Sequence, residues 1–366
     1  MKVFRTPLLR NLKTGFGIVA REFERASAGL HDDVTVVLAN HGPWTKQNIV
    51  WLFWETGKPP VSWTAKLADL RHIWTPTRFC QEAFARSGIR SEVMPLGINP
   101  AYFQIRDTDS LTRSRLYRYK HVHLERSRTE YSVCRVIPQI AHKQTPQSWF
   151  RFLYPFDWIE RKGPDIALRA FAEEFSSKDD IELVFCKFGL CTWTPNRLLS
   201  PVELMQQIAK IKPDLPRIVM LTNFPRYPRI SELYRLSDCL VAPFRGQGVS
   251  MPVMEAMACG IPVITTNFGG TPETITSDLG WLIKVKDVVP VRMLDHFVPY
   301  QGEDLGTYAE PDLHHLKKCM REAFEYADQT RKKGIKASEF IRCNFTWSKS
   351  VARACKYVED NWKCSR

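Results

Sequence analysis

Short apolar runs alternate with amphipathic stretches along most of the chain. In the first hundred residues, five runs have the length and residue types of buried strands; they span residues 2–6, 34–38, 49–53, 72–75 and 92–96. Helical periodicity lies between them, at 18–27 and 78–87. Strands that alternate with helices predict a parallel sheet, so this half of the chain is predicted to form a small doubly wound α/β domain.

The same alternation returns after residue 149. The predicted strands span residues 150–156, 181–187, 218–222, 239–243, 262–265 and 281–283. The predicted helices between them span 165–175, 201–211, 229–236 and 251–259, and three more close the chain at 311–326, 329–343 and 347–362. The pattern predicts a second α/β domain with a helical end.

Residues 104–148 interrupt this pattern. They hold nine Lys and Arg against four Asp and Glu, with no sustained period of 2 or 3.6. Because a long structureless stretch is uncommon inside a compact domain, we predict a basic inter-domain linker or insertion here.

Composition adds limits to this two-domain picture. The chain has 366 residues, of which 44% are hydrophobic and 25% charged, enough for two cores. Its net charge of +13 suits nucleotides, nucleic acid or anionic lipid, and charge alone does not choose among them. No nucleic-acid-binding module stands out, which argues against a nucleic-acid partner. Ten cysteines without a CxxC pair and the lack of a long apolar run predict a reduced, cytoplasmic protein.

The segment 239–260 carries the first chemical signal. A predicted strand runs into a turn with two glycines, and a helix follows with Pro252 in its first turn and Gly260 after its end. The amides and the dipole at such a helix start favour an anion, and glycines let a ligand approach the backbone. Glu255, one turn into the helix, is suited to the paired hydroxyls of a ribose. It is equally suited to a structural role beside the helix dipole.

The exact residue sequence of this segment is more informative than its strand–turn–helix pattern. RGQGVSMPVMEAMACGIPVITTNFGGTPETI, residues 245–275, resembles the donor-site motif of the retaining family 4 glycosyltransferases of group 1 type, which have the GT-B fold. That motif has two Glu separated by seven residues, here Gln247 and Glu255, and a later Gly-Gly turn with a Glu, here 269–273. The resemblance implies two Rossmann-like domains that face a cleft, with a C-terminal helix crossing back to the first domain.

Other pieces stand in the family's order. FDWIERKG, residues 156–163, resembles the loop whose Lys contacts the donor diphosphate, here Lys162. The resemblance divides the chain into an N-terminal acceptor-side domain at 1–103, the basic linker or insertion at 104–148, a nucleotide-sugar-binding domain at 149–345 and the returning helix at 346–366. It implies transfer of a sugar from a nucleotide-diphosphate sugar to an acceptor hydroxyl, with retention of the anomeric configuration.

The resemblance also implies a set of site residues. Two cations and the amides at the helix start hold the diphosphate, Glu255 holds the ribose, and a glycine loop closes from the other domain. The predicted donor-binding residues are Gly15, Gly17, Arg161, Lys162, Gly248, Ser250, Met251 and Glu255. No cofactor and no metal are expected beyond the donor itself. The acceptor, whether glycan, lipid or protein, stays open, as does a peripheral contact with an anionic membrane.

Three positions depart from the family pattern. Gln247 replaces the first Glu of the motif, which keeps a hydrogen-bond acceptor and loses the charge. Phe156 stands where the family often has an Arg, and the family's cleft His is missing from the strand end that reads Trp54-Glu55. We therefore take Gln247 and Glu55 as the catalytic candidates.

The alternative is a catalytically degenerate GT-B protein that binds nucleotide or a partner without turnover. The sequence Asp-Thr-Asp at 107–109 spells a metal motif of the other glycosyltransferase fold, and we interpret it as coincidence because it lies outside any strand end.

Overall fold

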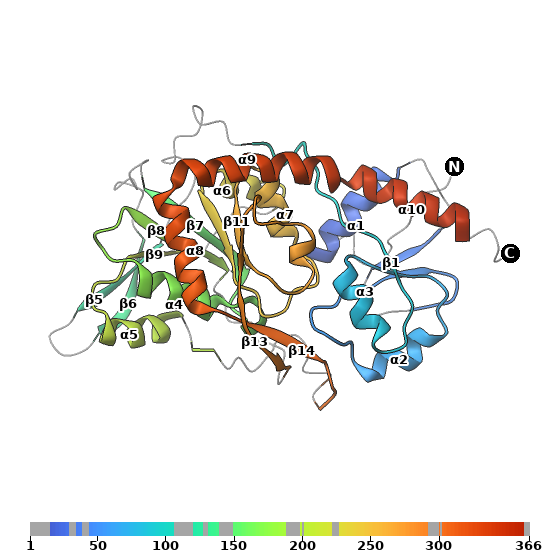
Figure 1. The fold of residues 1–366 in the computed structure, drawn as a ribbon, viewed down its shortest axis with the longest axis horizontal. Helices are drawn as coiled ribbons and strands as arrows, with labels where there is room; N and C mark the ends of the chain where they lie inside the picture. The colour runs from blue at the N-terminus through green and yellow to red at the C-terminus, as the bar shows by residue number, and fades with distance from the viewer. Residues whose placement is uncertain are drawn as a thin grey trace.

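The computed structural model describes residues 15–28, 34–38, 44–105, 120–126, 131–138, 149–187, 198–199, 201–221, 227–291, 300 and 302–361. Two α/β domains lie side by side, and two long helices run along one edge of both (Figure 1). The strand predicted at 2–6 and the motif at 107–109 lie outside the described residues.

The N-terminal domain has a four-stranded parallel sheet in the order β1-β2-β3-β4. Its strands are β1 (Val36–Leu38), β2 (Ile49–Trp51), β3 (Ile73–Thr75) and β4 (Glu92–Val93). Helix α1 (Gly15–Ala26) precedes β1 and α3 (Arg78–Ala85) lies between β3 and β4, as predicted; α2 (Val61–Ala68) was not predicted. Phe23, Trp51 and Trp74 meet edge-on in the core, with the Phe23 and Trp51 ring centres 5.2 Å apart.

The C-terminal domain is built on an eight-stranded sheet in the order β12-β11-β10-β7-β8-β9-β5-β6. The six strands β7 to β12 are parallel and fall where the sequence predicted them: β7 (Phe150–Asp157), β8 (Ile181–Lys187), β9 (Arg217–Met220), β10 (Cys239–Ala242), β11 (Val263–Thr266) and β12 (Trp281–Ile283). The helices between them are α4 (Pro164–Glu174), α5 (Pro201–Ile211), α6 (Ile230–Arg235) and α7 (Met251–Ala258). The strand order of this sheet reverses between β10 and β7, which is the doubly wound arrangement that the alternation predicts, whereas the four described strands of the N-terminal sheet follow one another in sequence order.

The two remaining strands of this sheet lie within residues 104–148, where the sequence predicted no strand. Residues 104–148 show no periodicity, yet β5 (Lys120–Arg126) and β6 (Tyr131–Pro138) form there as an antiparallel pair. Strand β5 also pairs antiparallel with β9, so the hairpin extends the C-terminal sheet at its edge. Pairing with a sheet edge supplies hydrogen bonds that do not depend on an alternating pattern, which is why the pattern missed it.

Three helices close the chain: α8 (Leu313–Glu325), α9 (Ala327–Asn344) and α10 (Trp347–Asn361). Helices α9 and α10 follow one another along the upper edge of the molecule in Figure 1, α9 over the C-terminal domain and α10 over the N-terminal domain. They are separated at Thr346, which forms a parallel bridge with Ile98. Helix α10 then contributes Trp347, Val351, Ala354 and Val358 to the core of the N-terminal domain.

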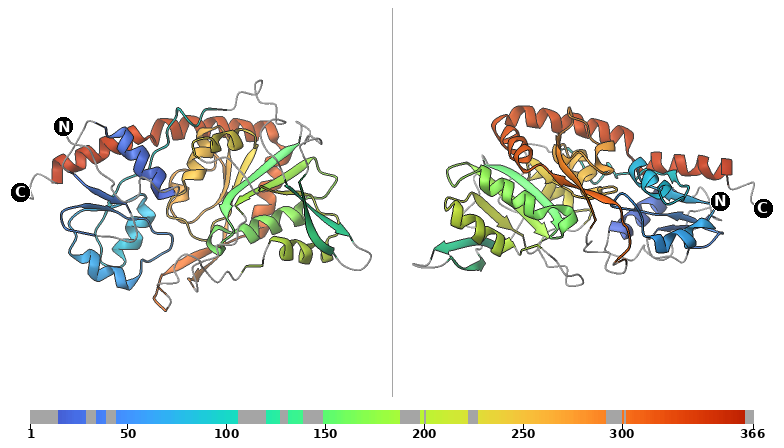
Figure 2. Two further views of the ribbon diagram at one scale, coloured as in Figure 1. Left: turned by 180° about the vertical axis from the view of Figure 1, so that it is seen from behind. Right: turned by 60° about the horizontal axis from the view of Figure 1, so that its bottom comes forward.

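A hairpin that the sequence did not predict reaches from the C-terminal domain to the N-terminal one. It consists of β13 (Val285–Pro290) and β14 (Thr307–Pro311), which pair antiparallel and project beyond the large sheet (Figure 2). At its tip the Gly57 amide donates to the Thr307 carbonyl at 3.0 Å, and the Thr56 hydroxyl donates to the Leu305 carbonyl at 2.6 Å. The hairpin is also held within the C-terminal domain, where the Arg245 guanidinium bonds to Glu310 and the Ala309 amide donates to the Arg245 carbonyl. These contacts are long-range, so they are not visible in local periodicity.

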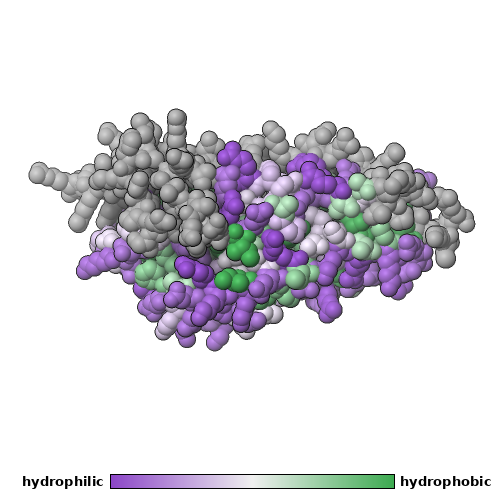
Figure 3. All heavy atoms as spheres, turned by 90° about the horizontal axis from the view of Figure 1, so that it is seen from above, coloured by the Kyte–Doolittle hydropathy of each residue, from purple (hydrophilic) through white to green (hydrophobic). Residues whose placement is uncertain are grey.

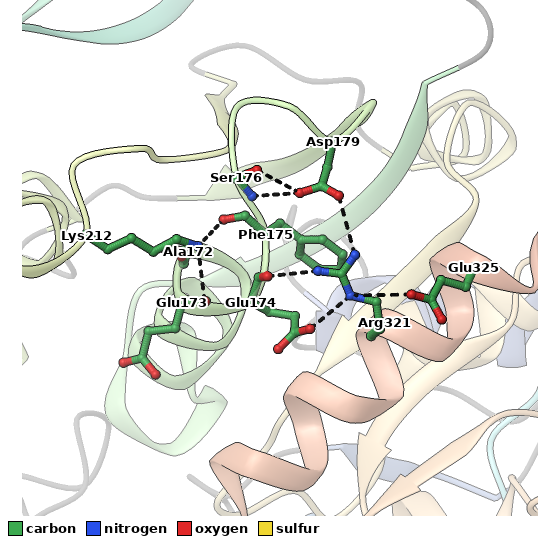
Figure 4. Close-up of polar contacts among 9 residues, drawn as sticks. All are labelled: Ala172, Glu173, Glu174, Phe175, Ser176, Asp179, Lys212, Arg321 and Glu325. Carbon is green, nitrogen blue, oxygen red and sulfur yellow. Dashed lines mark hydrogen bonds and ion pairs between the residues drawn. The ribbon is translucent and has the colours of Figure 1, made fainter.

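Charged side chains also fix the C-terminal end of α4 (Figure 4). Arg321 of α8 donates to Glu174 at 2.9 Å and stacks 4.3 Å from the centre of the Phe175 ring. The Lys212 ammonium donates to carbonyls of the last turn, among them those of Ala172 and Glu173. Cations at a helix C-terminus stabilise the dipole, so we interpret this cluster as structural.

The molecular surface and the helix lengths complete the description. Seen from above, the described part of the surface is mostly hydrophilic, with small separate apolar patches (Figure 3). Among the described helices, none has the length and hydropathy that a membrane crossing requires. Seven of the cysteines in the described part of the chain are free thiols.

Candidate active site

The turn between β10 and α7 is anchored from both sides by Arg245. Its guanidinium donates to both oxygens of Asp165 at 2.8 Å and to Glu310 of β14 at 2.8 Å and 3.1 Å. These carboxylates raise the pKa of Arg245, although burial acts in the opposite direction. The amides of Arg245 and Gly246 donate to the Arg161 carbonyl, so the turn and the loop before α4 form one unit.

Two cations of that loop converge on Gln247. The Arg161 guanidinium donates to the side-chain oxygen Oε1 of Gln247 at 3.1 Å, and the Lys162 ammonium donates to the same oxygen. Gln247 itself is buried, and its amide nitrogen donates to the Val249 carbonyl. The sequence placed these three residues in one site, and the structure brings their polar atoms together.

Phe156, which stands where the family pattern often has an Arg, packs in an aromatic cluster beside the Lys162 ammonium. It is buried against Phe244, with the ring centres 4.8 Å apart. The Lys162 ammonium lies 4.9 Å from the centre of the Phe244 ring and 5.7 Å from that of Phe156. At the position where the family pattern often has an Arg, this chain therefore has an aromatic ring that, with Phe244, packs beside the Lys162 ammonium.

The end of β2 faces the turn from the N-terminal domain. One carboxylate oxygen of Glu55, Oε2, accepts the Gly248 amide at 2.8 Å and lies 3.5 Å from Nη1 of Arg161. A Cβ on Gly248 would stand 2.0 Å from the Trp54 carbonyl oxygen, so only glycine fits there. Glu55, one of the two predicted catalytic residues, thus lies beside the predicted donor residues across the domain interface.

The Gly-Gly turn of the motif also packs on the N-terminal domain. A Cβ on Gly270 would stand 1.9 Å from the Gly248 carbonyl oxygen and 2.7 Å from the Thr77 hydroxyl. The Glu273 carboxylate accepts the amides of Arg78 and Phe79, the first residues of α3, at 2.9 Å and 2.8 Å. This part of the motif therefore caps a helix of the other domain, a contact that resemblance alone did not predict.

Glu255 lies deeper than the rest of the site. Its side chain is buried, and its oxygen Oε2 accepts the Tyr234 hydroxyl at 2.8 Å. Burial and the Glu255 charge together raise the pKa of Tyr234, so this hydroxyl stays a hydrogen-bond donor. The predicted ribose ligand is thus oriented by a tyrosine that the sequence analysis did not single out.

A second tyrosine and a second carboxylate stand nearby. Burial and the charges of Glu22 and Glu255 raise the pKa of Tyr227, which also hydrogen-bonds to Glu22 of α1. The Tyr227 ring meets that of Tyr102 edge-on, with 5.7 Å between centres. Sequence reasoning missed Glu22, and its only signal was an acidic residue on the inner face of the predicted first helix.

The other predicted residues lie around these groups. Gly15 is exposed, and nothing stands within 4 Å of where its Cβ would be; Gly17 is buried. Phe16, between them, packs edge-on against Phe53 at 5.2 Å, which places the start of α1 near the end of β2. Ser250 is the N-cap residue of α7 without a side-chain capping bond, and half-buried Met251 packs against the cores of both domains.

A pocket of about 350 Å³ lies on the interface, next to this site but not in it. Its walls come from the start of α3, the end of β4, α7, the Glu273 turn and α10. All ten predicted site residues are described, and none of them lines the pocket. One neighbour, Cys80, is an unsuitable nucleophile because burial raises the pKa of its thiol to about 12.

Comparison with known proteins agrees with this architecture. Residues 151–294 match the family model Glycosyl transferases group 1. The chain is 27% identical over 156 residues to a D-inositol 3-phosphate glycosyltransferase of Segniliparus rotundus, which is 41% of this chain and 30% of that one. It is 26% identical over 137 residues to a GDP-mannose-dependent mannosyltransferase of Corynebacterium glutamicum, 36% of this chain and 32% of that one. The matches thus span about a third of these relatives.

Solved structures cover more of the chain at lower identity. Sucrose-phosphate synthase from Thermosynechococcus elongatus superimposes with a TM-score of 0.60 and 13% identity, over 96% of this chain and 79% of that one. HepE from Anabaena, solved with UDP and glucose, gives 0.59 and 13%, over 96% and 84%. At this identity the likeness concerns the fold.

Two facing Rossmann-like domains with a helix that crosses between them define the GT-B class, as the sequence predicted. In sequence, residues 151–294 are similar to the group 1 glycosyltransferases.

Proposed function

We propose that this chain transfers a sugar from a nucleotide-diphosphate sugar to an acceptor hydroxyl with retention of configuration. The observation that carries the proposal is the convergence of Arg161 and Lys162 on Gln247 in front of α7, with Glu55 opposite. Cations at the start of a helix suit a diphosphate that gains charge as it departs. The comparisons support a nucleotide-sugar donor, and UDP-glucose and GDP-mannose are the first to test.

The proposed residue roles follow from the positions of the side chains. Lys162, Arg161 and the amides from Gly248 to Met251 hold the diphosphate, and Glu255, oriented by Tyr234, holds the ribose. Gly15 and Gly17 close the site from the N-terminal domain, and Gln247 contacts the transferred sugar.

The reaction itself needs no further group. The bond between the anomeric carbon and the phosphate oxygen breaks, and the acceptor oxygen bonds to the same face of the sugar. The acceptor proton moves to the departing phosphate oxygen, so the products are a glycoside and a nucleoside diphosphate. Contact between the domains excludes water, which would otherwise take the place of the acceptor.

The direct test combines binding with turnover. A thermal-shift screen of nucleotide sugars identifies the donor, because a ligand of the folded state raises apparent stability. We then expect Lys162→Ala to release nucleoside diphosphate about 100-fold more slowly than wild type, since it removes a phosphate-stabilising charge. Glu255→Ala is expected to weaken donor binding, and exposed Lys210→Ala serves as the control. Equal rates in all four proteins contradict the proposal, whereas EDTA is expected to leave the rate unchanged.

A non-catalytic nucleotide-binding protein is the second candidate. It is favoured by one observation: Gln247 is uncharged and already bonded to Lys162. In that case nucleotide sugars bind without turnover, and Gln247→Glu creates the activity.

A cytoplasmic location with peripheral membrane contact is also proposed, from the net charge of +13. Co-sedimentation with vesicles of anionic lipid, weakened by salt, is the expected result, and binding equal to that of neutral vesicles contradicts it.

A further inference from the structure

Glu55 and Gln247 come from opposite domains and share one cation. The Nη1 atom of Arg161 donates to Oε1 of Gln247 at 3.1 Å and lies 3.5 Å from Oε2 of Glu55. The Glu55 side chain is 17% exposed and that of Arg161 is 10% exposed, so water screens this pair only in part. The Glu55 carboxylate and the Gln247 amide therefore lie on the same Arg161 guanidinium, and Gln247 is the position at which the family motif has a Glu.

We propose that Glu55 supplies, from the N-terminal domain, the negative charge that Gln247 lacks. The inference rests on the proposed transfer reaction. As the bond to the departing phosphate breaks, positive charge builds up at the anomeric carbon, and a fixed carboxylate stabilises that charge. In this step Glu55 forms no bond and takes no proton, because the acceptor proton goes to the departing phosphate oxygen.

The other carboxylates of the motif and the Arg245 cluster are directed at other partners. Asp165 and Glu310 are bound to Arg245, and Glu273 caps α3. Glu255 is buried against Tyr234. With Arg161 and Lys162 alone, the centre would favour the diphosphate and oppose a cationic sugar. Glu55 balances one of these cations.

Backbone contacts that do not involve the carboxylate hold residue 55 in position, so removal of its charge should not move it. A Cβ on Gly246 would stand 2.6 Å from the Glu55 carbonyl oxygen, so the main chains touch. The next residues, Thr56 and Gly57, bond to the hairpin of β13 and β14. Glu55→Gln retains an oxygen for the Gly248 amide, and it removes the charge while keeping the shape.

The test is a double-mutant cycle on Glu55→Gln and Gln247→Glu. Donor binding is followed by thermal shift, and release of nucleoside diphosphate is followed with UDP-glucose and GDP-mannose as probes. We expect Glu55→Gln to lower turnover about 100-fold without weakening donor binding. The double variant, with its carboxylate moved to position 247, is expected to recover at least about tenfold over Glu55→Gln. Gln247→Glu should raise turnover by a smaller factor in the wild-type background than in Glu55→Gln, because the charge is already present in wild type.

Exposed Glu82 of α3 provides the matched control, since Glu82→Gln makes the same chemical change away from Arg161. Wild-type turnover in Glu55→Gln overturns the inference and leaves the transferase function intact. A double variant no faster than Glu55→Gln also overturns it, as does a gain from Gln247→Glu in the wild-type background that equals or exceeds the gain in Glu55→Gln. If wild type binds a donor without releasing product, both the transferase function and this inference fail.

Discussion

The two domains meet through α10 and through the glycine turns, and these attachments differ in what holds them. Helix α10 inserts Trp347, Val351 and Val358 into the apolar core of the N-terminal domain. At the other attachment, Gly248 lies against the Trp54 carbonyl oxygen and Gly270 lies against the Thr77 side chain, so a carbon added to either glycine would collide with the N-terminal domain. The apolar attachment should therefore be sensitive to atoms that are removed, and the glycine attachment to atoms that are added.

The largest effect is expected from Trp347→Ala. Trp347 is 4% exposed, and its loss should lower the free energy of unfolding by about 3–5 kcal/mol, as for other buried aromatic side chains. Urea denaturation measures this change, with exposed Lys349→Ala on the same helix as the control. A loss no greater than that of the control would mean that α10 does not hold the N-terminal domain.

Gly270→Ala should act on the glycine attachment instead. The φ angle of Gly270 is −85°, so alanine suits the backbone and the expected effect is steric. The added methyl group would meet Thr77 of the N-terminal domain as well as the Gly248 carbonyl oxygen. A cost of about 3 kcal/mol to this contact between the domains should slow donor turnover about 100-fold.

Gly334→Ala is the comparison for this variant, because its Cβ would stand 2.0 Å from the Gly260 carbonyl oxygen inside the C-terminal domain. We expect Gly334→Ala to lower the free energy of unfolding, while the turnover per folded molecule changes little. Equal losses of turnover in the two variants, at matched folded fraction, would contradict a special role for the interface.

Glu273→Ala should have a smaller effect on the same attachment. It removes the acceptor of the first two amides of α3, and the loss of a helix cap costs about 0.5–2 kcal/mol. Urea denaturation and turnover should both decline modestly, whereas exposed Glu325→Ala should leave turnover unchanged. An unchanged Glu273→Ala protein would show that α3 keeps its N-terminus without the other domain.

The smallest effect concerns pH at the α10 attachment. His72 precedes β3, and its Nδ1 lies 3.0 Å from the Tyr357 hydroxyl of α10. Burial, followed by the Arg71 charge, lowers the pKa of His72 in the folded protein. The unfolded chain therefore takes up the proton first, and stability should decline as the pH falls below about 6.5 toward the lower folded value.

Melting temperatures at pH 7.5 and pH 5.5 measure this dependence, and His72→Gln should reduce it. A decline of the same size in His72→Gln would assign the pH dependence to other groups.

Particular residues show which parts of the fold and of the site could be predicted from the sequence. The alternation predicted strands β7 to β12 and the helices that close the chain, because each buries one periodic face. The motif predicted that Lys162, Gln247 and Gly248 belong to one site. It did not predict that Glu273 caps α3 or that Tyr234 binds Glu255, since those partners lie 195 and 21 positions away. The hairpin of β13 and β14 was missed because it is held by residues far away in the sequence, in both domains.

The sequence by itself determined two α/β domains and a glycine turn before a helix, since periodicity and turn residues act locally. Only the tertiary structure decided which groups meet at that turn. Gly248 is required because the Trp54 carbonyl lies against it, and Glu55 becomes a neighbour of Gln247 because β2 ends opposite the turn. Such contacts depend on how the two domains pack. The packing sets the short distances between charged groups, and these distances decide how strongly the charges interact.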